Sequence, residues 1–408
     1  MRLLYLTPTS AMGGAERVLL DLMSIVRTAR PSWTLGLIAG NDGPLTSEAQ
    51  ALGIDTTVLP FPRDFAQLGD AGLGSPRSWF DFGRHALRGS AALVRYATRL
   101  KAEVGQFTPD IVHSNGIKMH VLGALVRPST ASLVWHFHDY PSARPVTSRF
   151  VRSLRSRCGA IIAVSNHVAE DIRRTLGNSM DVRVIWNSVD LQRFAPDGPV
   201  ADLAGLAGLP PAPPGTITIG LVATFARWKG HTLFLDMLRR IASTHSFRGY
   251  IIGGPLYETQ ASQVSFEQLK AVIEEYGLTD RVGMTGFTDS ASALRALDIV
   301  VHASTKPEPF GLVIAEAMAV GKPVVISSAG GVSELVSDGS TGLVYSVGQT
   351  DDMVRQVRRL LEDRQLRTSI GSAAHVAATH QFHRDRFTRQ VIDLYGGVSS
   401  GPARRSAA

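Results

Sequence analysis

Two carboxylates flank an expected helix start within the ten residues 307–316, which read Pro-Glu-Pro-Phe-Gly-Leu-Val-Ile-Ala-Glu. Two prolines and Gly311 prevent a regular helix through Glu308, so we expect this carboxylate on a loop. A helix that begins at about residues 310–312 would carry Glu316 in its first or second turn. Its free N–H groups and positive dipole end would lie beside Glu308 and could bind a phosphate. An ordinary strand-to-helix turn with a favourable early Glu is the alternative.

A second stretch, residues 224–231, reads Thr-Phe-Ala-Arg-Trp-Lys-Gly-His and follows an expected strand. Lys229 and Arg227 would stand where the strand end could present cations to a diphosphate, and lysine makes a compact contact with phosphate oxygen. Taken alone, these cations would be surface residues. Their combination with the Glu308 loop favours an anion site.

The first half of the chain contains Gly13 and Gly14 between an expected strand and an amphipathic helix. Consecutive glycines let the backbone come close to a ligand, and the following helix start favours negative charge. The spacing does not form G-x-G-x-x-G, so it does not predict a dinucleotide site.

His136 and His138 end another expected strand, in the run Trp-His-Phe-His-Asp. Alternation along a strand sends both imidazoles to the same side. At the carboxyl edge of a sheet that side can face a ligand, although hydrogen-bonded structural histidines are an equal alternative. We expect no metal site, because no full ligand set with suitable spacing accompanies these histidines.

The elements expected to hold these residues are short apolar runs that alternate with helical patterns, which is typical of a doubly wound parallel α/β sheet. Ligands of such sheets bind at the carboxyl ends of the strands. The expected strands are 3–7, 35–39, 111–113, 133–137, 161–165 and 182–186 in the first half, and 217–223, 250–253, 282–285, 299–302 and 324–326 in the second.

Chain length and breaker residues predict two domains. A chain of 408 residues exceeds what one hydrophobic core usually supports. Residues 194–216 are rich in proline and glycine and suit a linker. We therefore expect an N-terminal domain at 1–199 and a C-terminal domain at 200–380. An amphipathic helix at 381–398 could pack back onto the first domain, and residues 399–408 are expected to be a disordered tail.

Composition indicates a globular protein in a reducing compartment. Hydrophobic residues make up 44% of the chain and charged residues 19%. Cys158 is the single cysteine, so an internal disulfide is excluded. The first residues lack a secretory signal pattern, and no apolar run reaches the ~20 residues of a membrane-spanning helix. We expect a soluble, cytoplasmic protein.

The positive charge lies mainly in the first half. The net charge is +7, and residues 1–200 contribute +6 of it, from 22 Lys+Arg against 16 Asp+Glu. The arginines of residues 84–99 could bring this half to the inner face of an anionic membrane, or the charge could attract an acidic acceptor. A plain solvated surface is the alternative. Nucleic acid is not expected as a partner, because aromatic stacking residues do not alternate with the arginines.

With these motifs together, the sequence resembles the retaining glycosyltransferases of the large GT4 family, which have the GT-B fold. The resemblance covers nearly the whole chain. The matching motifs are Gly13-Gly14-Ala15-Glu16, His138-Asp139, Ala163-Val164-Ser165, Val184 to Asp190, Lys229-Gly230, the pair Glu308 and Glu316, and Gly330 to Glu334.

The resemblance implies two Rossmann-like domains that face a central cleft, with a UDP- or GDP-sugar as the expected donor. No cofactor or metal is expected. Glu316 would bind the donor ribose, and Lys229 would neutralise charge on the leaving phosphate. Glu308 and His138 would approach the donor sugar. The diphosphate would meet the glycine loop at 13–14 and the backbone of Phe310, Gly311, Leu312 and Val313.

The sequence departs from the family at the position of a phosphate-binding arginine, where it has Thr224. Arg227 could replace that cation from the loop. The family also has Asn-Gly-Val-Asp where this chain has a serine at 188, which would alter only a turn.

The resemblance implies transfer of a hexosyl group, with retained anomeric configuration, to a hydroxyl of a glycan, a lipid-linked intermediate or a small molecule. The product would belong to glycan, polysaccharide or glycolipid biosynthesis. An epimerase or hydrolase of the same fold and a non-catalytic nucleotide-sugar binding protein are the alternatives.

Overall fold

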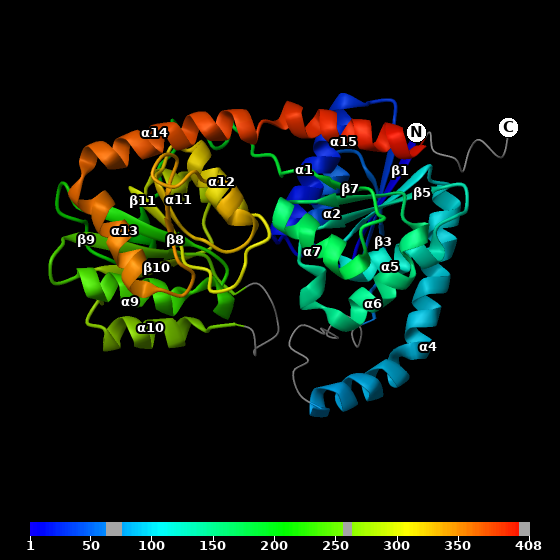
Figure 1. The fold of residues 1–408 in the computed structure, drawn as a ribbon, viewed down its shortest axis with the longest axis horizontal. Coiled ribbons are helices and arrows are strands. Elements are labelled where there is room, and N and C mark those ends of the chain that lie inside the picture. Colours follow the sequence, from blue (N-terminus) through cyan, green and yellow to red (C-terminus); the bar gives the residue numbers. More distant parts are fainter. Residues whose placement is uncertain (63–75, 256–262, 400–408) are drawn as a thin grey trace. The chain divides into compact units, whose positions relative to one another are not determined.

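The computed structural model describes residues 1–62, 76–255 and 263–399, and for residues 76–90 it describes only the helical path of the backbone (Figure 1). The chain divides into two compact units. Unit 1 comprises Met1–Ser188 with Arg384–Ala408, and unit 2 comprises Val189–His383. The predicted tail at 399–408 lies outside the described residues except for Ser399.

Unit 1 contains one parallel sheet with the strand order β3-β2-β1-β4-β5-β6-β7. Its strands are β1 (Arg2–Thr7), β2 (Thr34–Ala39), β3 (Asp55–Val58), β4 (Ile111–Asn115), β5 (Ser132–Phe137), β6 (Ala160–Ala163) and β7 (Val182–Val184). Its helices are α1 (Gly14–Ala29), α2 (Pro44–Ala51), α4 (Pro76–Phe107), α5 (Ile117–Val126), α6 (Pro145–Ser153), α7 (Asn166–Leu176) and α15 (Arg384–Ser399), with 3₁₀ turns η1 (Pro141–Ala143) and η2 (Arg155–Arg157).

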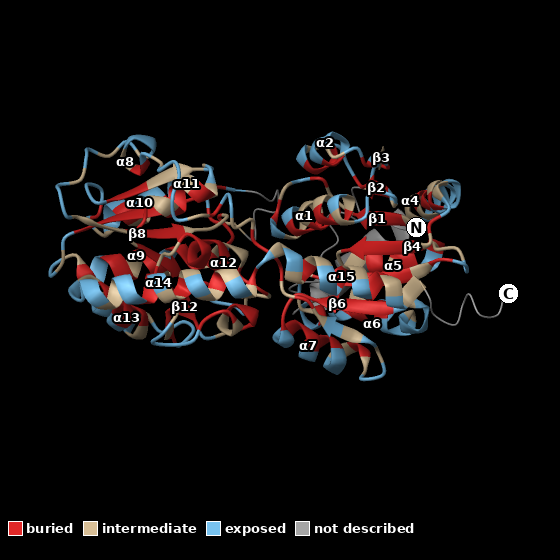
Figure 2. Cartoon of the chain, turned by 90° about the horizontal axis from the view of Figure 1, so that it is seen from above, coloured by how far each residue is buried: buried red, intermediate tan, exposed pale blue. Residues whose placement is uncertain are grey.

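The apolar runs of unit 1 form strands because both faces of the sheet are covered by helices. The central strands are buried, whereas the outward faces of the helices are exposed (Figure 2). Helix α15 packs against α1, and its residues Phe387, Val391 and Tyr395 join the core formed by strand residues such as Leu3 and Ile162. The C-terminal helix is thus part of unit 1.

Unit 2 contains a second parallel sheet, in the order β10-β9-β8-β11-β12-β13. Its strands are β8 (Ile217–Val222), β9 (Phe247–Ile252), β10 (Val282–Gly286), β11 (Ile299–His302), β12 (Val324–Ser327) and β13 (Leu343–Tyr345). Its helices are α8 (Leu203–Leu206), α9 (His231–Ile241), α10 (Phe266–Glu275), α11 (Ser290–Arg295), α12 (Leu312–Ala319), α13 (Thr350–Glu362) and α14 (Arg364–Gln381), with 3₁₀ turns η3 (Arg227–Lys229) and η5 (Gly331–Glu334).

The strand order of unit 2 reverses between β8 and β11, which are direct neighbours. In a doubly wound sheet the loops at such a switch point diverge and leave a crevice at the carboxyl ends of the strands. The connections that leave these two strands contain Lys229 and Glu308. The topology therefore positions the two motifs that carry the most chemistry.

Residues 189–199 belong to unit 2 because Arg295 holds their backbone. Its guanidinium donates to the carbonyl oxygens of Ala195 at 2.9 Å and Pro199 at 3.2 Å, and also to that of Arg193. The composition predicts a boundary near residue 200 and a C-terminal helix from 381, whereas the units divide after Ser188 and again after His383. A boundary predicted from proline and glycine content cannot take these hydrogen bonds of Arg295 into account.

The predicted doubly wound α/β class is confirmed, and each of the eleven predicted runs overlaps a strand of the structure. Two strands were not predicted, β3 and β13, and each forms an edge of its sheet. In the part of the chain that the structure describes, no helix has the length and apolarity needed to cross a membrane.

Candidate functional site

The loops that follow β8 and β11 are tied to each other by backbone hydrogen bonds. The strands are paired at Ile299 with Ile219, and beyond them the Thr305 N–H donates to the carbonyl oxygen of Trp228 at 2.8 Å. Lys229 follows Trp228 directly. This tie brings Lys229 to the loop that carries Glu308.

Gly230 allows the close approach of the two loops. Its φ is +73°, and a Cβ built on it would stand 1.8 Å from the carbonyl oxygen of Ala303. A side chain at this position would therefore require backbone movement. The Lys-Gly motif is explained by this contact: Gly230 allows the approach and Lys229 supplies the charge.

Lys229 and Glu308 form a close ion pair. The Lys229 Nζ lies 2.7 Å from Glu308 Oε1 and 2.7 Å from Oε2. The side chains are 18% and 12% exposed, so the pair is largely removed from water. The ammonium also lies 4.1 Å from the ring centroid of Trp228, within the range of a cation–π contact.

Glu308 has two further hydrogen-bond donors that the sequence motifs did not predict. The Oε2 atom accepts from Ser304 Oγ at 3.0 Å and from His302 Nε2 at 3.2 Å. Burial opposes ionisation, but Lys229 and His302 outweigh it and hold the pKa of Glu308 well below its usual range. His302 ends a predicted strand, six residues before Glu308. Its position at the carboxyl end of that strand could have identified it as a candidate site residue.

The start of α12 offers backbone donors next to this pair. Gly311 has a φ of +87°, and a Cβ there would stand 2.6 Å from Val332 Cγ2. Within the described residues, the N–H groups of Gly311, Leu312 and Val313 have no acceptor. Phe310 is buried, and its ring packs against Phe382. This arrangement can bind an anion.

Three further predicted donor-binding residues lie in the same unit. Glu316 lies in the second turn of α12 and is 6% exposed. Thr224 is half-buried in the connection after β8. Arg227 begins η3 and is exposed, and its guanidinium makes no hydrogen bond or ion pair with the described residues. Arg227 is therefore available for a ligand, and its role stays a prediction.

In unit 1, Gly13 caps the N-terminus of α1 and is buried, and Gly14 is exposed at its first position. A Cβ on Gly14 would meet no atom within 4 Å, so this glycine leaves open space at the helix start. Burial raises the pKa of Glu16, in the first turn, to about 7. The loop lies at the carboxyl end of β1.

His138 follows β5, two strands from β1 in the same sheet, and is positioned by two neighbours. Its Nε2 lies 2.6 Å from Asn115 Oδ1, so Nε2 carries the proton and Nδ1 can accept a hydrogen bond. The ring of His136 lies 4.0 Å away, centroid to centroid. Burial lowers the pKa of His138 to about 3, so the imidazole is neutral near pH 7. Sequence reasoning missed Asn115, which ends β4.

His136 is fully buried, and neither of its ring nitrogens has a hydrogen-bond partner in the described structure. Burial lowers its pKa well below the usual range. Of the two predicted histidines, only His138 is partly exposed. Among the described residues, no group of three or more His, Cys, Asp or Glu side chains could hold a metal ion.

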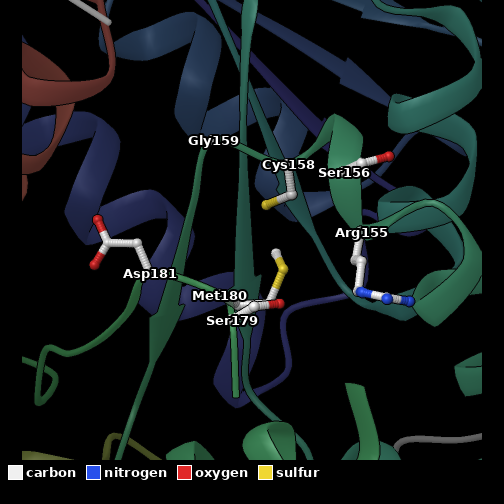
Figure 3. Close-up of a pocket in the computed structure, with 7 residues that line it drawn as sticks. All are labelled: Arg155, Ser156, Cys158, Gly159, Ser179, Met180 and Asp181. Carbon is white, nitrogen blue, oxygen red and sulfur yellow. The ribbon is translucent and has the colours of Figure 1, made fainter. Parts of the chain in front are cut away.

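A cavity of about 360 Å³ lies elsewhere in unit 1 (Figure 3). Its lining includes Arg155, Cys158 and Asp181. Cys158 and Asp181 precede β6 and β7, so the cavity is at the amino ends of these strands, opposite the edge that carries His138. Burial raises the pKa of the Cys158 thiol, which leaves it a poor nucleophile.

Models of known protein families match residues in both halves of the chain. A model of the family Glycosyl transferases group 1 matches residues 210–376, and a model of Glycosyltransferase Family 4 matches residues 45–193.

Two curated relatives illustrate the similarity. The lipopolysaccharide core biosynthesis mannosyltransferase LpsB of Rhizobium meliloti is 31% identical over 59% of this chain and 66% of its own length. A GDP-mannose-dependent alpha-(1-6)-phosphatidylinositol monomannoside mannosyltransferase of Mycobacterium tuberculosis is 26% identical over 64% of this chain and 68% of its own length. The matches to curated relatives cover between 38% and 68% of each relative's length, and less than two thirds for most of them.

Among solved structures, that of HepE from Anabaena in complex with UDP-glucose superposes with a TM-score of 0.79 at 24% identity, over 97% of this chain and 100% of that one. This likeness confirms the expected fold. Because the two family models together cover most of both units and include the motifs around Lys229, Glu308 and Glu316, the chain belongs to the GT4 glycosyltransferases, which have the GT-B fold.

Proposed function

We propose that this protein is a retaining glycosyltransferase that moves a hexosyl group from a nucleotide-diphosphate sugar to a hydroxyl acceptor. One observation carries the proposal: the Lys229–Glu308 pair stands beside the start of α12, where three N–H groups have no acceptor within the described residues. A cation and free backbone donors at a helix start suit a diphosphate, and a carboxylate beside them suits the sugar attached to it.

In the proposed reaction, the bond between the anomeric carbon and the diphosphate oxygen breaks, and a bond to the acceptor oxygen forms on the same face of the sugar. The leaving nucleoside diphosphate takes the proton of the acceptor hydroxyl. Lys229 neutralises the charge that grows on the diphosphate, which stabilises the transition state more than the bound donor. Negative charge near the anomeric carbon stabilises its oxocarbenium character.

The remaining site residues have these proposed roles. Glu316 binds the ribose, Glu308 faces the sugar, and His138 of unit 1 contacts the same sugar. Arg227 replaces the arginine that the family has at the position of Thr224. Gly13, Gly14 and the backbone from Phe310 to Val313 border the diphosphate, and the reaction needs no metal or other cofactor.

The donor is proposed to be a UDP- or GDP-sugar. The HepE structure contains UDP-glucose, and the mycobacterial relative is named as dependent on GDP-mannose. A thermal-shift screen of UDP-, GDP- and ADP-sugars identifies the base, because a ligand that binds the folded state raises its melting temperature. Failure of all three classes to shift the melting temperature at millimolar concentration would contradict the proposal.

Incubation with the selected donor alone, followed by addition of acceptors, separates the other activities of this fold. Transfer to an added hydroxyl acceptor supports the transferase. Isomerised sugar without acceptor would identify an epimerase, and free sugar released at the same rate with or without acceptor would identify a hydrolase. Tight binding without turnover on any acceptor would identify a nucleotide-sugar binding protein.

The acceptor is proposed to belong to glycan, polysaccharide or glycolipid biosynthesis, in line with the relative that is named for lipopolysaccharide core biosynthesis. We extend the proposal to peripheral contact with anionic membrane through unit 1. In α6 the exposed Phe150 lies between the exposed Arg149 and Arg152, and in α4 Arg95 is exposed beside Val94. Arg84 and Arg88, part of the same expected basic helix, lie outside the residues whose side chains are described.

Basic residues around exposed apolar side chains favour an anionic lipid surface. Co-sedimentation with phosphatidylglycerol vesicles, but not with phosphatidylcholine vesicles, is expected at low salt. Absence of binding to the anionic vesicles would remove this part of the proposal.

A further inference from the structure

The ion pair at the site raises a physical difficulty for the proposed function. Lys229 donates to both carboxylate oxygens of Glu308, which occupies two of its three N–H groups and leaves only one for a diphosphate while the pair is intact. If the lysine turns to the phosphate, it leaves a largely buried carboxylate behind. A buried carboxylate that loses its partners is costly unless other donors satisfy it.

We propose that His302 is a positioning residue that keeps Glu308 hydrogen-bonded when Lys229 turns to the diphosphate of the donor. The inference rests on the proposed function. His302 Nε2 lies 3.2 Å from Glu308 Oε2, and Ser304 Oγ donates to the same oxygen at 3.0 Å. Both donors stay in place when the lysine moves, so the carboxylate keeps part of its hydrogen bonding and its orientation toward the sugar.

The surroundings of His302 hold its ring in the required state. The carboxylate of Glu308 can only accept, so Nε2 carries the ring proton. Nδ1 is then an acceptor and lies 3.3 Å from the hydroxyl of Ser327, which can donate to it. Tyr345 Oη donates to the backbone oxygen of His302 at 3.0 Å, and the imidazole side chain is 9% exposed. Ser327 and Tyr345 therefore hold His302 in the position from which it donates to Glu308.

Without His302, Glu308 would depend more strongly on Lys229, and the lysine would be released to a diphosphate less readily. The loss in nucleotide affinity should therefore require Lys229. A role of His302 in packing alone would change affinity by the same factor with or without the lysine. The dependence of the affinity loss on Lys229 therefore distinguishes a positioning role of His302 from a role in packing alone.

The test is a double-mutant cycle with Lys229→Met, His302→Leu and the double variant of the full chain, in which UDP and GDP are titrated by calorimetry. His302→Leu is expected to weaken binding of the recognised nucleotide roughly five- to ten-fold when Lys229 is present and by less than about two-fold when it is methionine, a non-additivity typical of residues in one network. His302→Gln keeps an N–H donor for Glu308 and is expected to restore affinity to within about two-fold of the parent protein.

The outcomes of the two proposals are distinguishable. If Lys229→Met leaves the affinity for both nucleotides unchanged, the proposed role of Lys229 fails, and the role of His302 fails with it. If Lys229→Met weakens binding but His302→Leu has the same effect in both backgrounds, only the positioning role is overturned. Should His302→Leu not fold, Ser327→Ala takes its place in the cycle, and equal effects with and without Lys229 overturn the inference in the same way.

Discussion

Removal of Lys229 should leave a buried negative charge, and the cost can be worked out from its contacts. Breaking a buried ion pair by removing one partner typically costs about 3–5 kcal/mol. Here Ser304 and His302 still donate to Glu308, and each hydrogen bond to a charged group contributes about 1.5–3 kcal/mol. We therefore expect Lys229→Met to destabilise unit 2 by about 2–4 kcal/mol at pH 7, which for a unit of this size corresponds to roughly 5–15 °C in its melting temperature.

The pH dependence of this loss has a defined sign. In the parent protein the pKa of Glu308 is depressed, so the ion pair stabilises the fold above the ordinary carboxyl pKa of about 4.3, and this contribution is lost as the pH falls below it. In Lys229→Met, burial becomes the main influence and is expected to raise the pKa of Glu308 above the ordinary carboxyl value. The deficit of the variant is therefore expected to be larger at pH 7.5 than at pH 5.

Differential scanning calorimetry at the two pH values measures the deficit. The double variant Lys229→Met/Glu308→Gln is the matched control, because a neutral amide removes the unpaired charge and keeps the shape. The control should recover most of the stability at pH 7.5. Equal deficits at both pH values, or no recovery in the control, would refute the proposed energetics of the pair.

Three further predictions concern single positions. Gly230→Ala should abolish nucleotide binding and lower the melting temperature more than Gly277→Ala, because both positions have positive φ but only a Cβ at 230 meets a backbone oxygen, as thermal shift would show. Arg227→Ala should weaken nucleotide binding about ten-fold with a reduced salt dependence, and unchanged binding in calorimetry would exclude Arg227 as the missing cation. Asn115→Asp should raise the pKa of His138, so that the NMR titration of its ring moves toward neutral pH and kcat/KM gains a new dependence between pH 5 and 8; a parent-like profile would contradict the assigned contact.

The interior of the fold was predictable because buried parallel strands are short apolar runs with breakers on both sides. The strands β3 and β13 were not predicted from the sequence, and the reason is physical. Each lies at an edge of its sheet, and their sequences, Asp-Thr-Thr-Val and Leu-Val-Tyr, are too short to give a clear pattern. In β3 the residues are also exposed or half-buried, so an edge strand of this kind lacks the continuous apolar character of the central ones.

The meeting of Lys229 and Glu308 was predictable at the level of topology, because the carboxyl ends of parallel strands share one edge of a sheet. Their direct ion pair was not, since the motif favoured separate contacts of each residue with a ligand. His302, Ser304 and Asn115 were also missed. Their hydrogen bonds depend on strand register and on side-chain rotamers, which a linear pattern of residue types does not contain.

The hydrogen bonds from Arg295 to the carbonyl oxygens of residues 193, 195 and 199 determine where a fragment that contains only unit 2 should begin. A gene fragment that starts at residue 200, where composition suggests a linker, would encode a protein whose Arg295 guanidinium has lost these acceptors. A fragment that starts at Val189 retains them, together with the hydrogen bond from the Val189 N–H to the Phe382 carbonyl oxygen that joins its two ends. Expression of unit 2 should therefore begin at 189 and end after 383.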